Sequence, residues 1–161
     1  MKNLKNYVMI LIVSTSLSLL TSCKKDKQSP NLPNTGSIVY QNKKMDITSA
    51  ISQNGDNGTW VYFNAEEAKC TVQVRFANVG EGIIPSGTFT LKQGQPYDPK
   101  INFSGGKLGI SIANNDIVEE FSSGAVSVEK NSNRYKISVN VMTAKGAVIC
   151  EYDGVLDKKG S

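Results

Sequence analysis

The side chains of this chain that could do chemistry are few, because it contains no histidine. Histidine is the commonest general base, metal ligand and pH switch, so Ser-His-Asp and Cys-His mechanisms are excluded. An enzyme here would depend on carboxylates, lysine or tyrosine. The acidic clusters are Glu66-Glu67 and Asp116, Glu119 and Glu120. Adjacent residues on a strand point to opposite faces, so these acids are expected to be solvated side chains, and only a convergence across loops would form a catalytic pair.

Cys23 is the residue with the most specific chemical context. It follows Leu20, Thr21 and Ser22, and this aliphatic-small-small-cysteine pattern resembles the lipobox of bacterial lipoproteins. Upstream lie two lysines and an apolar run over residues 7–20, the layout of a secretory signal and shorter than a membrane span. The sequence predicts a cleaved signal peptide over residues 1–22 and lipidation of Cys23 by a diacylglycerol and an acyl chain such as palmitate. Two or more chains give stable anchoring.

Residues 23–36 are expected to form a flexible tether, because they hold two prolines, a glycine and mostly polar side chains. The Ser-Cys-Lys-Lys-Asp start resembles lipoproteins of the Bacteroidota, in which lysine and acidic residues after the cysteine can mark export to the cell surface. That resemblance implies attachment to the outer membrane. Only one acid, Asp26, is present, so the periplasmic and cell-surface faces both stay open.

The remaining cysteines, Cys70 and Cys150, have two readings. An exported protein meets an oxidising compartment, where the two thiols can pair. Both are expected to point inward, and a disulfide between them would close a long loop. Inward position alone does not make two cysteines neighbours, so two buried free thiols packing as small apolar groups are the alternative.

Three aromatic residues are candidates for ligand contact. Trp60 and Tyr62 share one face of a predicted strand, and Tyr97 lies in a loop bracketed by prolines. Exposed rings could stack on a sugar or line a pocket, although core packing is the commoner role. A calcium loop beginning at Asn54 fails, because its twelfth position, which needs a bidentate glutamate, is Ala65. No metal or cofactor is expected.

The net charge of +4 belongs to the ends of the chain rather than to its folded part. Of 18 basic and 14 acidic residues, five lysines and one aspartate precede Gly36, which leaves 13 of each sign after it. A nucleic-acid binder needs a basic footprint. The balanced charge therefore argues against a nucleic-acid partner.

Alternation of apolar and polar residues with a period of two predicts an all-β domain over residues 37–157. One short helical turn is expected within residues 46–53, and another at 65–68. Strands at this spacing favour a single antiparallel β-sandwich or a flattened up-and-down, calycin-like barrel of about eight strands. The strands are expected at residues 37–40, 59–64, 69–76, 87–91, 107–113, 124–130, 134–141 and 147–156.

The C-terminal half carries a second resemblance. The segment 123–130 reads SGAVSVEK, and Tyr135, Ile137 and the glycine-tyrosine pattern of residues 146–156 follow it. This is similar to the closing strands of uncharacterised Bacteroidota lipoproteins, with Pro85-Ser86-Gly87 matching the start of their middle strand. The shared positions are turn glycines and core aromatics, so the resemblance implies an antiparallel β domain and no activity.

Three functions fit these observations. The first is a membrane-anchored, non-enzymatic module that binds a glycan, a peptide or a partner protein, with exposed aromatics at one end of a sandwich and no deep cavity. The second is a lipocalin-like carrier, which needs a closed barrel around an apolar cavity. The third is a carboxylate-based hydrolase, which needs two converging acids, one with a raised pKa. The sequence favours them in that order.

Overall fold

The computed structural model describes residues 32–112 and 115–159. The predicted signal peptide, Cys23 and residues 24–31 lie outside the described residues. Within the described part the chain is entirely strands, turns and loops, and no helix there is long and apolar enough to cross a membrane.

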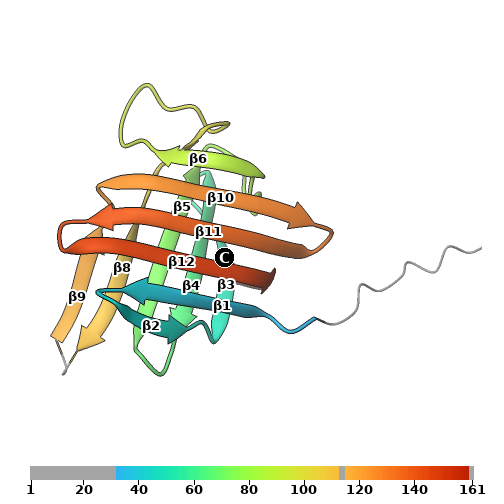
Figure 1. The fold of residues 1–161 in the computed structure, drawn as a ribbon. Helices are drawn as coiled ribbons and strands as arrows, with labels where there is room; N and C mark the ends of the chain where they lie inside the picture. Colours follow the sequence, from blue (N-terminus) through green and yellow to red (C-terminus); the bar gives the residue numbers. More distant parts are fainter. Residues whose placement is uncertain (1–31, 113–114, 160–161) are drawn as a thin grey trace, which may run out of the picture. The chain divides into compact units, whose positions relative to one another are not determined.

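Thirteen strands within the described residues form two sheets (Figure 1). Sheet A has seven strands in the order β2-β1-β12-β11-β10-β6-β7, and sheet B has six in the order β13-β3-β4-β5-β8-β9. The strands of sheet A are β1 (Thr35–Tyr40), β2 (Lys43–Asp46), β6 (Gly87–Leu91), β7 (Asn102–Phe103), β10 (Ser123–Asn131), β11 (Arg134–Thr143) and β12 (Gly146–Val155). Those of sheet B are β3 (Ser49–Gly55), β4 (Gly58–Ala65), β5 (Cys70–Ala77), β8 (Gly105–Ile112), β9 (Asn115–Glu120) and β13 (Asp157–Lys159).

The alternation in the sequence is the physical reason for this arrangement. Along β4 and β5 every second residue is buried and its neighbours are half-buried, as expected for strands with one face on a core. The predicted inward set of β5 is fully buried: Cys70, Val72, Val74 and Phe76. The β3–β4 turn also has the conformation that its residue types favour. Asp56 and Asn57 both have positive φ, which Asp and Asn tolerate in two-residue hairpin turns.

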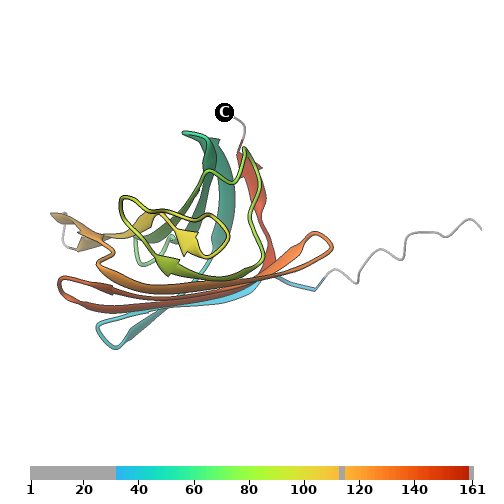
Figure 2. The same ribbon diagram turned by 90° about the horizontal axis from the view of Figure 1, so that it is seen from above.

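The core lies between the two sheets, whose strands cross steeply (Figures 1 and 2). All five phenylalanines of the chain are buried. Two aromatic contacts join the sheets: Phe76 meets Phe89 edge to face at 5.3 Å, and Phe63 packs on Tyr152 at 5.5 Å. The sheets pack on each other without closing into a barrel. The predicted β-sandwich is therefore confirmed, and the alternative of a calycin-like barrel is wrong.

Several details of the prediction needed correction. The helical turn expected within residues 46–53 is wrong, because strand β3 occupies Ser49–Gly55 and buries Ala50 and Ser52. The up-and-down order is interrupted, since the chain leaves sheet B after β5, adds β6 and β7 to sheet A and returns as β8. Strand β3 and the shorter strands β2, β7, β9 and β13 raise the number from the eight expected to thirteen within the described residues.

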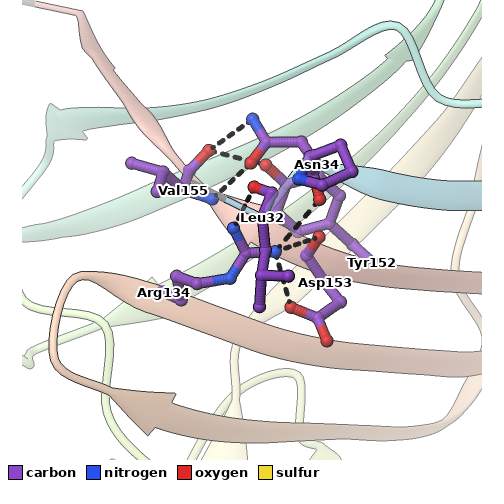
Figure 3. A network of polar contacts seen from close by, with 7 residues as sticks. Leu32, Asn34, Arg134, Tyr152, Asp153 and Val155 are labelled. Carbon is purple, nitrogen blue, oxygen red and sulfur yellow. Dashed lines mark hydrogen bonds and ion pairs between the residues drawn. The ribbon is translucent and has the colours of Figure 1, made fainter. Parts of the chain in front are cut away.

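The folded unit begins earlier than residue 37, because the segment before β1 is fixed to the end of sheet A (Figure 3). The Arg134 guanidinium donates to the carbonyls of Leu32 at 2.7 Å and Pro33 at 3.2 Å, and pairs with the Asp153 carboxylate at 3.0 Å. The Asn34 amide oxygen accepts from the Val155 backbone N–H at 2.9 Å. Residues 32–36, which the sequence assigned to the tether, belong to the domain.

Removing this contact should loosen the start of the domain. We expect Arg134→Met, which keeps the apolar stem, to lower the free energy of unfolding by about 1–2 kcal/mol because four acceptors, including the Asp153 carbonyl, lose a charged donor. Hydrogen exchange of the 32–40 peptide should also accelerate, and mass spectrometry reads both the exchange and its location. Lys136→Met, on an exposed lysine of the same strand, is the control; equal exchange in the two variants would contradict the fixed segment.

Candidate functional site

The outer surface of sheet B carries the two aromatic residues that the sequence singled out. Six half-buried side chains point away from the core and form a surface that we call the sheet B face: Ile51 and Gln53 on β3, Trp60 and Tyr62 on β4, and Gln73 and Arg75 on β5. They form two rows across three neighbouring strands. Gln53, Trp60 and Arg75 are register partners, as are Ile51, Tyr62 and Gln73.

The aromatic rings of this face are ordered by their neighbours. Trp60 and Tyr62 are nearly parallel, with 6.4 Å between their centroids. The Arg75 guanidinium lies 5.4 Å from the centre of the Trp60 ring, a cation–π distance. Partial burial raises the pKa of the Tyr62 hydroxyl, so it stays a neutral phenol at physiological pH. The two rings therefore present a fixed aromatic strip along β4.

Arg75 has more hydrogen-bonding capacity than the protein uses. Its Nη2 atom is 3.5 Å from the Asp56 carbonyl and 3.6 Å from the Asp56 carboxylate, both long contacts. Its Nε atom is buried and has no hydrogen-bond partner among the described residues. Because buried polar groups are nearly always paired, this buried Nε–H donor is an unusual feature of the face.

Amide groups beside the rings are also unengaged. Asn64, Thr71 and Ser49, one step further along the strands, bond to one another at 3.0–3.1 Å. Gln53 and Gln73, by contrast, have no side-chain hydrogen bond within the described part of the chain. Each amide offers two donors and an acceptor. The sheet B face thus combines aromatic surface with free hydrogen-bonding groups.

Tyr97 lies apart from the aromatic strip and serves its own loop. Its hydroxyl is 3.0 Å from the Asn102 carbonyl and 3.2 Å from the Ala77 carbonyl, joining the 92–101 loop to the end of β5. Burial raises its pKa, while the Ala77 bond and the positive charge of Arg75 lower it. Arg75 is thus near both Tyr97 and Trp60. The Tyr97 hydroxyl itself is already hydrogen-bonded within the fold.

Cys70 and Cys150 are both buried free thiols in the structure, which is the second of the two arrangements that the sequence left open. Cys70 faces the core from sheet B and Cys150 from sheet A. Burial raises the pKa of Cys70 to about 11 and that of Cys150 further still. Both positions accept a small apolar side chain, and packing alone accounts for their inward orientation.

The acidic clusters do not converge. Glu66 and Glu67 are exposed in the β4–β5 turn, whereas Asp116, Glu119 and Glu120 lie on β9 at the other edge of the sheet. Only Glu119 is buried, and its carboxylate accepts a 2.7 Å contact from the Lys145 ammonium. The hydrogen bond from Lys145 lowers the pKa of Glu119, which is opposite to the shift that a general acid needs. Glu119 and Lys145 instead join sheet B to the β11–β12 turn of sheet A.

This ion pair should make the fold sensitive to acid. The pKa of the Glu119 carboxyl is lower in the folded than in the unfolded chain. The stabilisation that the pair contributes is therefore complete at pH values above the ordinary pKa of 4.5, and it is lost as the pH falls through the folded pKa. We expect Lys145→Met to lower the urea midpoint at pH 7 and to converge on the wild type once the pH is below the folded pKa of Glu119. Lys100→Met, an exposed lysine in a loop, should match the wild type throughout. A pH-independent loss in Lys145→Met would contradict the pairing.

Other candidate sites are weaker. No three acidic or cysteine side chains among the described residues are grouped so as to hold a metal ion. Two open depressions lined by described residues lie on the outside of the molecule. One borders β1, β2 and β12 with Lys44, Lys136 and Glu151, and the other lies between β2 and the β4–β5 turn. The first contains one aromatic residue, Tyr152, which is buried and whose hydroxyl donates to the Val155 carbonyl at 2.6 Å, and the second contains none.

Sequence reasoning found the rings and missed the polar side chains beside them. Alternation along β5 places Gln73 and Arg75 on the outward face, but only the strand register brings Arg75 next to Trp60. The first function predicted exposed aromatics at one end of the sandwich; the structure instead places the pair on a sheet surface and Tyr97 in a loop. Comparisons with known proteins return no match to this chain among protein families, curated proteins or solved structures.

Proposed function

We propose that this chain is a lipid-anchored, non-catalytic binding module that holds its ligand on the sheet B face. The observation that carries the proposal is the combination of Trp60 and Tyr62 with unengaged donors and acceptors on Gln53, Gln73 and Arg75. Lipidation at Cys23 would attach the module to the outer membrane. The nine residues 23–31 reach at most about 30 Å when extended, which would keep the domain near the membrane.

The alternatives have less support. A lipocalin-like carrier depends on a closed barrel around a cavity. Here the two sheets are not closed into a barrel, and five phenylalanines fill the space between them. A hydrolase depends on two converging acids, whereas the one buried carboxylate of the described residues is neutralised by Lys145. A binding surface needs neither feature. It needs a rigid scaffold with accessible aromatic and polar groups, which the sheet B face supplies.

Binding to envelope material tests this proposal. The soluble chain that starts after Cys23, whose residues from 32 onward contain the whole described core, is immobilised and exposed to envelope extract from the bacterium that makes it. We expect saturable retention that falls about tenfold in Tyr62→Ala/Gln73→Ala. Asn140→Ala, on the outer surface of sheet A, is the matched control. Equal retention by both variants would refute a ligand site on sheet B.

A further inference from the structure

The sheet B face places apolar and polar groups side by side over an area that matches one or two small rings. Trp60 and Tyr62 offer aromatic surface, and the amides of Gln53 and Gln73 flank them on the neighbouring strands. A pyranose has the complementary character. Its ring faces carry C–H groups that pack on aromatic rings, and its rim carries hydroxyls that each donate and accept a hydrogen bond.

The charges around the face argue for a ligand without net charge. Arg75 lies beside Asp56, and Lys107, the next residue in the Tyr62 row, is the register partner of Glu120. Each of these two cations therefore has a carboxylate beside it, and β13 adds one charge of each sign, because Lys159 and Asp157 are the register partners of Gln53 and Ile51. An anionic ligand would meet one repulsive group for each attractive one, whereas hydroxyls could accept hydrogen bonds from the terminal guanidinium nitrogens of Arg75 without an ionic cost.

A protein partner fits less well. The centres of protein interfaces are dry and apolar, but the largest exposed apolar side chains of the described residues lie elsewhere. Only Val118 belongs to sheet B; the others are Leu32, Ile83, Ile101, Met142 and Ile149. The neighbours of the rings are glutamines and an arginine. This environment suits a ligand that needs hydrogen bonds at every edge.

Space for a ligand is left on β8, next to the polar row of β5. Gly105 and Gly109 are the register partners of Arg75 and Thr71. A Cβ atom built at either glycine would meet no atom within 4 Å. The missing side chains leave low, open surface beside Arg75 and Thr71, on either side of Lys107, the register partner of Gln73. A ligand on the rings would therefore have room to extend over β8 on either side of that lysine.

We propose that the sheet B face binds a neutral saccharide, with a sugar ring against Tyr62 and Trp60 and its hydroxyls bonded to Gln53, Gln73 and Arg75. This rests on the proposed function and names the ligand class of that same face. The half-exposed rings and the absence of an enclosing wall suit a segment of a polysaccharide chain. The ligand would be held in place, with no bond made or broken.

Trp60 gives a direct readout, because it is the only tryptophan of the chain. Intrinsic fluorescence of the soluble chain is titrated with neutral oligosaccharides of glucose, mannose, xylose and galactose and with polygalacturonate as the anionic comparison. We expect one or more neutral sugars to change the emission saturably. Preference for polygalacturonate over every neutral sugar would overturn the neutral assignment.

Two variants locate the sugar. Tyr62→Ala removes a stacking surface, and Gly109→Val places a side chain in the open space while adding a residue that favours strands. Both should weaken binding about tenfold or more, with an unchanged or higher urea midpoint for Gly109→Val. Asn140→Ala should bind as the wild type does. Undiminished affinity in Tyr62→Ala and Gly109→Val would place the sugar elsewhere and overturn the proposal.

Pretreatment of the envelope extract separates this inference from the proposed function. Periodate followed by borohydride destroys sugar diols, and proteinase K destroys protein ligands. Loss of sheet B-dependent retention after periodate alone supports the saccharide, including when no sugar of the panel binds. Loss after proteinase K alone overturns the saccharide and leaves the binding module standing. Failure of every sugar and of untreated extract to bind through sheet B overturns both.

Discussion

Phe89→Ala is expected to lower the free energy of unfolding by about 3–5 kcal/mol, the usual cost of emptying a buried phenylalanine site. Phe89 is fully buried on β6 and meets Phe76 of β5 edge to face. Its removal takes away one of the two aromatic contacts between the sheets. The surrounding strands are held by their ladders and cannot close the gap, so the cavity term adds to the lost burial. Urea denaturation followed by circular dichroism measures the change.

Thr88→Ala is the matched control for this measurement. Thr88 is the preceding residue, is exposed and contacts only the Ser127 hydroxyl at 3.1 Å. Its replacement should change stability by about 0.5 kcal/mol or less. A loss below about 1 kcal/mol for Phe89→Ala would show that the sheets do not depend on this contact.

Cys23→Ser is expected to abolish the attachment of the protein to the membrane. The proposed anchor needs a thioether, which a serine hydroxyl does not form, and stable anchoring needs two or more acyl chains. In cells fed labelled palmitate, the variant should carry no label and should accumulate as an uncleaved precursor. Cys70→Ala, which alters a buried thiol of the domain, should keep the label. Label retained in Cys23→Ser would refute lipidation at this residue.

The strands with strict alternation were predictable from the sequence. In β5, β10 and β11 the apolar set predicted to face inward is buried, apart from the half-buried Tyr135 at the start of β11. Such strands have one possible orientation, because a shift of one residue would expose the whole apolar set. Residues 46–53 lack this signal. Ala50 and Ser52 face inward while the larger Ile51 points outward, so the pairing with β4 decides their structure rather than their own pattern.

Gly106 shows a second limit of reading the sequence alone. The Ser104-Gly105-Gly106 segment resembles a turn, yet it opens strand β8. A Cβ atom at Gly106 would lie 2.4 Å from the Phe121 ring and 2.2 Å from the Gln73 carbonyl oxygen. Glycine is required there by close packing, not by a turn. Close approaches between residues far apart in sequence leave no local pattern.

The candidate site divides in the same way. Alternation along one strand was enough to place Trp60 and Tyr62 on a common face. The role of Arg75 depends on the β4–β5 register and on the turn that brings Asp56 near it. The two arrangements of Cys70 and Cys150 stayed open for a related reason, since two inward cysteines on different sheets need a relative position that no single strand encodes.

Hydroxyl-radical footprinting of the protein with and without bound envelope material tests the central claim most directly. Oxidation of each side chain is read by mass spectrometry, and aromatic and methionine side chains are good reporters. The sheet B site predicts that binding protects Trp60 and Tyr62, while Met142, exposed on the outer surface of sheet A, is oxidised as before. Protection of Met142 with unchanged oxidation of Trp60 and Tyr62 would contradict it.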